Sequence, residues 1–208
     1  MNPDNITTHY FFLFYKKAIE QAEAANSYKD AFVPIVLSAF AIESFLNSLP
    51  LFCAEEQELK LLKKTLNDNL QTASPQDKFR ITYALLKLEH VTENDKAVEI
   101  LAHIDTVMRL RNFIAHKKPS NASADVREKR RIDAHSPKWL KRIKPILQDE
   151  IQFRSEFECL QPVVAKWAAN VAFNSMVFVS KLFPSTTMAH HSLGFAISDE
   201  SEPFKTTK

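Results

Sequence analysis

The chain has 208 residues, of which 45% are hydrophobic, and its net charge is +2. This length favours one domain with a single core. The one glycine, Gly194, leaves no material for the glycine-rich loops that hold phosphates in Rossmann and P-loop proteins, so those nucleotide-binding classes are excluded. The same scarcity disfavours tight hairpins and favours helices joined by Pro, Asn and Ser.

Cysteines and histidines give no pattern of a metal or redox site. Cys53 and Cys159 lack CxxC spacing, and the seven histidines form no HExxH motif. We therefore expect no metal and no cofactor. Residues 1–10 carry no signal-peptide pattern, so we expect free thiols, a cytoplasmic location and no membrane partner.

Apolar periodicity predicts an all-α fold, an up-and-down helical bundle. The first helix is expected over 9–25, with one apolar and one charged face. The second, over 28–53, is apolar nearly all round, so neighbours should surround it. Its length would suit a membrane span, but Glu43 and Asn47 lie in its middle, which favours a core helix.

Two shorter helices are expected next. A charged helix over 55–70 has a leucine stripe, and a second opens at Pro75 with Ser74 as its N-cap and runs to Leu88. Either Thr92 or Asn94 is the expected cap of the helix that follows.

The remaining long helices are predicted over about 95–115 and about 162–183. The first of these carries Arg111 within its apolar stripe, where a charge demands a partner. The last helix is expected to pack beside 28–53. Together these elements predict one helical domain over 1–184, and residues 185–208 lack periodicity, which is typical of a flexible tail.

A basic insertion or helical hairpin is expected over 117–160, before the last helix. Residues 117–144 contain ten basic and three acidic residues. Such a segment can track an RNA backbone while Trp139 stacks a base, or it can be a solvated charged loop, and both remain open. The candidate RNA-binding residues are Lys117, Lys118, Arg127, Lys129, Arg130, Arg131, Lys141 and Arg142.

Glu43 and Arg111 each interrupt an apolar helix face. A buried charge left alone costs several kcal/mol, so we predict that the two side chains pair. A pair of this kind can also serve only to fix the register of two helices.

The sequence Arg111-Asn112-Phe113-Ile114-Ala115-His116 resembles the RN-xxx-H motif of HEPN domains. The segment around Glu43, Ala41-Ile42-Glu43-Ser44-Phe45-Leu46-Asn47, is similar to the acidic second-helix segment of several HEPN families. The resemblance covers about 8–116 and the final helix. It implies a homodimer whose cleft, built from the motif of each copy, cuts RNA without a metal.

The residue types suit that chemistry. RNA supplies its own nucleophile, the 2′-hydroxyl, so the protein must move protons and stabilise charge on the phosphate. His116 is expected to transfer protons and Arg111 to bind phosphate oxygens. Asn112 is expected to donate a hydrogen bond or to orient His116, and Glu43 to hold Arg111.

One geometric difficulty accompanies this assignment. Five residues of regular helix rotate by about 140°, so Arg111 and His116 would not share a face of an unbroken helix. We therefore expect the helix to end or distort near Ala115, as Pro119 permits. One histidine cannot serve as base and acid in the same step, so a second copy is expected to supply the other.

Three functions are consistent with these residues. The first is a metal-independent endoribonuclease, as in toxin or defence systems, with an antitoxin or regulatory protein as partner. The second is a non-catalytic HEPN-like adaptor that binds a protein or nucleotide in the same cleft. The third is an unrelated helical interaction module, in which Arg111 would approach neither Glu43 nor a second protomer.

Overall fold

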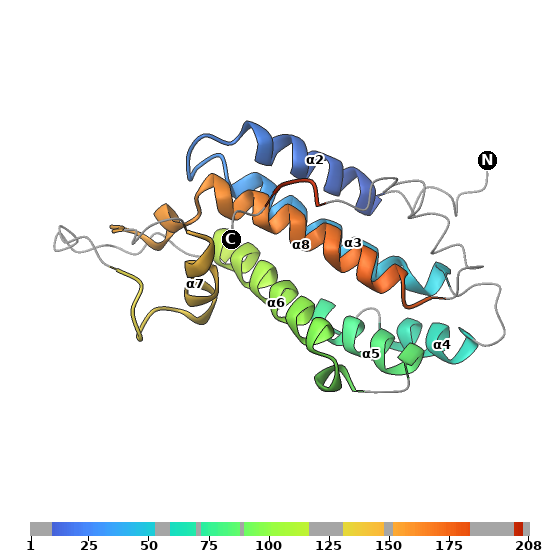
Figure 1. The fold of residues 1–208 in the computed structure, drawn as a ribbon. Coiled ribbons are helices and arrows are strands. Elements are labelled where there is room, and N and C mark those ends of the chain that lie inside the picture. Colours follow the sequence, from blue (N-terminus) through green and yellow to red (C-terminus); the bar gives the residue numbers. More distant parts are fainter. Residues whose placement is uncertain are drawn as a thin grey trace.

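The computed structural model describes residues 10–52, 59–69, 72–87, 90–116, 131–147, 152–183 and 202–205. Within these ranges the chain forms α-helices and short 3-10 helices and no β-sheet, which confirms the all-α prediction (Figure 1). The helices are α2 (Tyr10–Ala24), α3 (Phe32–Phe52), α4 (Lys60–Asn69), α5 (Pro75–Lys87), α6 (Asp95–His116), α7 (Lys138–Ile143) and α8 (Pro162–Ser180). The 3-10 helices are η2 (Val91–Glu93), η3 (Lys144–Ile146) and η4 (Glu156–Cys159).

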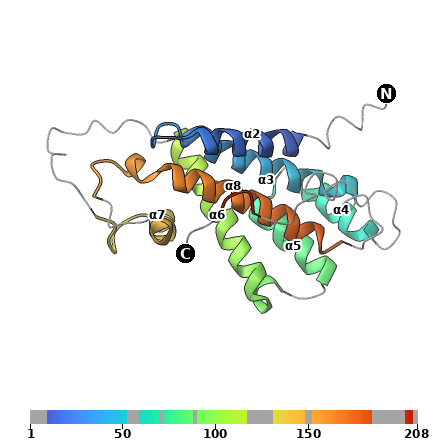
Figure 2. The same cartoon turned by 45° about the horizontal axis from the view of Figure 1, so that its top comes forward.

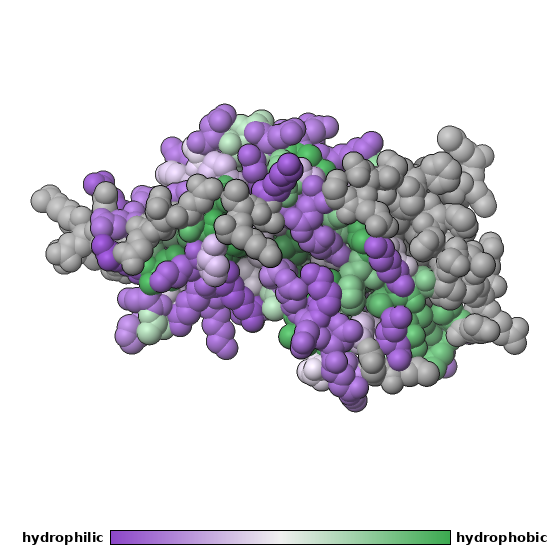
Figure 3. Space-filling view, in the orientation of Figure 1, coloured by the Kyte–Doolittle hydropathy of each residue, from purple (hydrophilic) through white to green (hydrophobic). Residues whose placement is uncertain are grey.

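Helix α3 is central in the bundle and contacts α2, α6 and α8. The four long helices α2, α3, α6 and α8 alternate in direction along the chain (Figures 1 and 2). Helices α4 and α5 lie together at one end, and α7 packs beside α6. On the face shown in Figure 3, hydrophilic residues cover α2, α6 and α7, and hydrophobic residues are visible between them and over α4 and α5.

The core consists of the apolar faces that the sequence pattern predicts. Phe11, Tyr15, Ala18 and Ala22 recur every three or four residues along α2 and are buried. The expectation that α3 is surrounded on all sides is wrong for part of its surface, because Val33 is 53% and Phe40 is 39% exposed.

Two caps fix where the helices that carry the candidate site begin. The hydroxyl of Ser74 accepts a hydrogen bond from the backbone N–H of Asp77 at 3.2 Å. The Asn94 side-chain oxygen accepts one from the backbone N–H of Ala97 at 3.0 Å, so Asn94 rather than Thr92 caps α6. The predicted starts of α5 and α6 are thereby confirmed.

Two helices, over Phe32–Pro50 and Pro162–Ser180, are long and apolar enough to cross a membrane. Of the apolar segments of these two helices, 56% and 72%, respectively, is buried inside the bundle. Core helices of soluble proteins reach the same length and hydropathy. The helices alone are weak evidence for a membrane span, and the cytoplasmic location stays a prediction.

Part of the predicted tail is docked on α8. The Asn170 side chain donates to the Phe204 backbone oxygen at 2.7 Å and accepts from the Phe204 backbone N–H at 3.1 Å. Residues 202–205 therefore lie against the bundle, shown as the short red segment in Figure 1, and the flexibility of the tail stays a prediction. The residues of that tail at 185–201 and 206–208 are outside the described ranges.

Candidate functional site

Glu43 and Arg111 meet between α3 and α6, as predicted. The Arg111 Nη1 atom donates to the Glu43 Oε2 atom at 2.5 Å. The Arg111 side chain is 23% exposed and that of Glu43 is 36% exposed, so solvent reaches the pair and it is less buried than expected. The contact is contrary to what the third function, an unrelated interaction module, leads one to expect.

Asn112 orients the arginine. Its side-chain oxygen accepts hydrogen bonds from Arg111 Nε at 3.2 Å and from Arg111 Nη2 at 3.1 Å. The Asn112 amide oxygen is directed at Arg111, and the expectation that Asn112 donates to a ligand or orients His116 stays a prediction. A guanidinium has five N–H donors, and Glu43 and Asn112 occupy three of those in Arg111. Two donors remain for a phosphate oxygen.

His116 is the last residue of α6 and is exposed. The helix continues through Ala115, so it ends one residue later than expected and without a break before the histidine. Regular helix geometry places His116 about 140° around the axis from Arg111. One copy of the chain therefore presents the two side chains on different faces of α6. Pro119 lies outside the described residues.

Lys78 is part of the same site and was not predicted. Its side chain extends from α5, is 4% exposed, and its Nζ donates to the Asn47 side-chain oxygen at 2.7 Å. Burial lowers the pKa of Lys78, and the carboxylate of Glu43 partly offsets that effect. Lysine is rarely buried without a partner. The hydrogen bond to Asn47 and the negative charge of Glu43 offset the free-energy cost of burying the ammonium of Lys78.

A pocket of 410 Å³ opens beside the ion pair, between α2 and α3. Its α3 wall comes from residues that recur every three or four positions and so share one face of the helix. Two aromatic residues of α2 complete it. The lining residues are Tyr10, Phe14, Phe40, Glu43, Ser44, Asn47 and Ser48.

Most of the predicted RNA-binding cations lie outside the described ranges, namely Lys117, Lys118, Arg127, Lys129 and Arg130. Among the other three, Arg131 is exposed. The ammonium of Lys141 donates to the Ala134 backbone oxygen at 2.5 Å.

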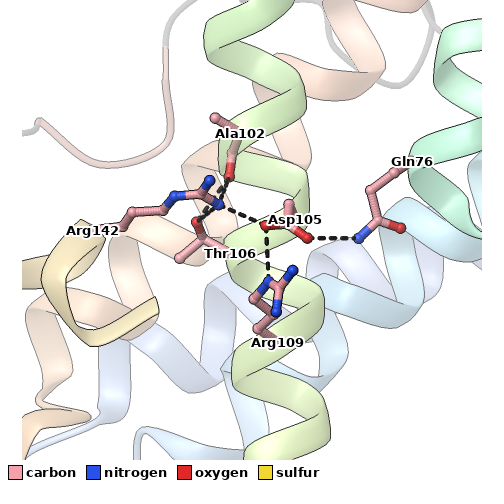
Figure 4. Close-up of polar contacts among 6 residues, drawn as sticks. All are labelled: Gln76, Ala102, Asp105, Thr106, Arg109 and Arg142. Atoms are coloured by element: carbon pink, nitrogen blue, oxygen red, sulfur yellow. Dashed lines mark hydrogen bonds and ion pairs between the residues drawn. The ribbon is translucent and has the colours of Figure 1, made fainter. Parts of the chain in front are cut away.

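Arg142 takes part in a hydrogen-bonded network that was not predicted from the sequence (Figure 4). Its Nη1 atom lies 2.6 Å from Asp105 Oδ2, and the same carboxylate accepts from Arg109 Nε at 2.9 Å and from Gln76 Nε2 at 3.3 Å. The network connects α5, α6 and α7. The contact of Arg142 with RNA stays a prediction, but its charge already has a structural partner.

Trp139 does not present its ring to a ligand. It is 7% exposed, and its ring packs against that of Phe113 on α6 with centroids 4.7 Å apart. Leu140 and Ile143 are also buried, so α7 is an amphipathic helix seated on the core. The idea that Trp139 stacks a base is wrong, and this described part of the insertion is more than a solvated loop.

Cys159 is a free, buried thiol. Burial raises its pKa to about 12, so it stays protonated near neutral pH and is a poor nucleophile. Cys53 lies outside the described residues. In the part of the chain that the structure describes, no three His, Cys, Asp or Glu side chains are grouped as metal ligands.

Comparison with family models, with curated proteins and with solved structures finds no significant match. The assignment of a function therefore depends on the geometry of the site.

Proposed function

We propose that the protein is a metal-independent endoribonuclease of the HEPN type. The observation that carries this proposal is the arrangement of Arg111, which Glu43 and Asn112 hold by three hydrogen bonds while two of its N–H donors remain. An arginine fixed in this way is preorganised to bind phosphate oxygens, and preorganised donors stabilise the charge that develops in phosphoryl transfer. His116 lies five residues, or about 1.4 helical turns, further along α6.

The proposed site is composite. Because His116 and Arg111 lie about 140° apart around α6, a cleft between two copies supplies what one copy lacks. The histidine of one copy removes the 2′-hydroxyl proton, and the histidine of the other protonates the leaving 5′-oxygen. The proposed cleavage breaks the P–O5′ bond and leaves a 2′,3′-cyclic phosphate and a 5′-hydroxyl.

A second function is favoured by one observation. Three of the five N–H donors of Arg111 already bond within the chain, and an ion pair with a purely structural role would show the same bonds. In a non-catalytic adaptor of the same fold, Glu43 and Arg111 would fix α3 against α6 and the neighbouring surface would bind a protein or a nucleotide.

The wild-type protein incubated with mixed RNA in excess EDTA tests the ribonuclease proposal. We expect cleavage whose rate is unchanged by the chelator and whose products carry 2′,3′-cyclic phosphate ends. Rates that rise more steeply than linearly with protein concentration are expected near the dimer dissociation constant. RNA that stays intact across varied substrates and protein concentrations would favour the adaptor.

A further inference from the structure

We propose that the 410 Å³ pocket between α2 and α3 binds a nucleobase. It would serve as the base subsite beside the phosphate site at Arg111, so this inference deepens the proposed function and rests on it for the position of the phosphate. The pocket volume lies within the range of about 300–1,000 Å³ that is typical of small-molecule sites.

The aromatic walls provide a stacking surface. Phe14 of α2 and Phe40 of α3 pack with ring centroids 5.7 Å apart, and Tyr10 extends the same wall by one helical turn along α2. Phe40 is 39% and Tyr10 is 47% exposed, although both are large apolar or aromatic side chains. Rings left open to solvent in a pocket are suited to stacking on the π-face of a base.

The polar edge of the pocket offers one hydrogen-bond acceptor and one donor side by side. Glu43 and Asn47 are four residues apart on α3 and so share one face. The ammonium of Lys78 has only donors, so it fixes the Asn47 oxygen towards itself and turns the Asn47 amide N–H₂ away. Glu43 uses Oε2 for Arg111, which leaves Oε1 as an acceptor.

An adjacent donor and acceptor match the edge of a nucleobase, which presents the same two functions in the opposite order. An aliphatic side chain of a protein partner would fill the aromatic part, but it would leave Glu43 Oε1 and the Asn47 N–H₂ without hydrogen-bond partners, which is costly. A base satisfies both parts of the pocket.

The charges nearby favour a phosphorylated ligand. Glu43 is shared between the pocket and the ion pair with Arg111, and the Lys78 ammonium lies 2.7 Å from the Asn47 oxygen. The buried ammonium of Lys78 adds positive charge behind this edge, and Arg111 keeps two N–H donors that can contact a phosphate. A nucleotide whose base occupies the pocket would place its phosphate on the side of Arg111.

Calorimetric titration of the full chain with the four nucleoside 5′-monophosphates tests this inference without any cleavage step. Ribose 5-phosphate is the control for the phosphate alone. We expect at least one monophosphate to bind about tenfold or more tightly than ribose 5-phosphate. The Phe40→Ala variant should weaken that binding by roughly 5- to 100-fold, as expected for one lost stacking contact.

Two further variants distinguish the loss of a contact with the nucleotide from the loss of the folded structure. Asn47→Asp keeps an acceptor for Lys78 but removes the donor of the pocket edge, so nucleotide binding should weaken while the melting temperature stays close to that of the wild type. Val33→Ala removes an exposed apolar side chain of α3 outside the pocket, and it should change neither property.

Equal affinities for monophosphates and ribose 5-phosphate would overturn the inference, as would an unchanged affinity in Phe40→Ala. Absence of nucleotide binding, together with a Phe40→Ala variant that shifts a dimer to a monomer in sedimentation, would also overturn it and assign the pocket to contacts between copies. Failure of this inference is distinguishable from failure of the ribonuclease proposal, because nucleotides can bind without RNA cleavage and RNA can be cut without a base pocket.

Discussion

The ammonium of Lys78 lies 2.7 Å from the side-chain oxygen of Asn47, and it connects α5 to the polar stripe of α3. Asn47→Leu removes the acceptor and leaves a buried cation, so we expect a loss of about 1–3 kcal/mol in the free energy of unfolding. Lys78→Met replaces the cation with an apolar chain of similar length and should cost less. Chemical denaturation of the three proteins measures the difference, and a larger loss in Lys78→Met would contradict this role for Asn47.

Removing the carboxylate partner of Arg111 should weaken the bundle. Glu43→Gln keeps the shape of the side chain but loses the charge-assisted hydrogen bond between α3 and α6. Because solvent reaches this pair, we expect a loss of only about 1 kcal/mol, observed as a lower denaturant midpoint with an unchanged m-value. The pair of Lys17 and Glu20 on the surface of α2 is a matched control, and Glu20→Gln should have a smaller effect. The account is contradicted if both substitutions have the same effect.

The Asp105 network makes stability fall in acid. Burial of Asp105 raises its pKa, but hydrogen bonds from Arg109 and Arg142 outweigh burial, so the pKa lies below the usual 3.8. A lowered pKa in the folded state means that the stabilisation is complete well above pH 3.8 and is lost as the pH falls through the folded value. Asp105→Asn should remove this acid dependence and cost about 1–3 kcal/mol near neutral pH. Unfolding curves recorded from neutral pH down to below pH 3.8 measure both the acid dependence and the loss of stability at neutral pH. An unchanged acid dependence in Asp105→Asn would rule out the Asp105 network as the source of that dependence.

His103 on α6 should add a second pH dependence with its own window. Burial lowers the pKa of His103 below 6.5, although Glu99 and Glu202 act in the opposite direction. The unfolded chain then binds a proton more readily than the folded one, so stability falls as the pH drops below 6.5 and levels off below the folded pKa. His103→Gln should flatten the unfolding free energy relative to the wild type over the pH interval just below 6.5. A wild-type profile already flat in this interval would contradict the assignment.

Apolar periodicity predicted the long helices closely, because each of them buries one face in the shared core. The expected start near residue 95 agrees with Asp95 in α6, and the cap at Asn94 is a local signal visible in the sequence. The pairing of Glu43 with Arg111 was also predictable, since each charge interrupts an apolar face and a charge in such a place requires an opposite one.

The contacts that were missed join charged or polar residues far apart in the sequence. Asp105 and Arg142 are 37 positions apart, and each occupies a helix position that is equally consistent with solvent exposure. Lys78 has one weak signal, because it lies four residues before the buried Thr82 on the inner face of α5. That signal alone does not predict burial of Lys78, since a lysine next to a proline-opened helix start is normally on the surface.

Phe40 is the opposite case to Lys78, because an apolar residue that the sequence pattern predicts to be buried is exposed. A helix that reads as apolar nearly all round predicts complete burial, and nothing in the pattern shows which face the neighbouring helices leave open. The polar side chains at Glu43 and Asn47 marked that face, but they were interpreted as evidence against a membrane span and, for Glu43, as the partner of Arg111, and not as signs of an exposed face.

The central claim is that His116 transfers protons during metal-free RNA cleavage, and one comparison tests it most directly. Wild type, His116→Ala and His90→Ala, the last a change of another exposed histidine, are purified, shown to be folded and incubated with RNA in excess EDTA. We predict that wild type and His90→Ala cut RNA at similar rates and leave 2′,3′-cyclic phosphates, while His116→Ala is slower by about 100-fold or more. Cleavage by His116→Ala at the wild-type rate, or intact RNA with all three proteins, would contradict the account.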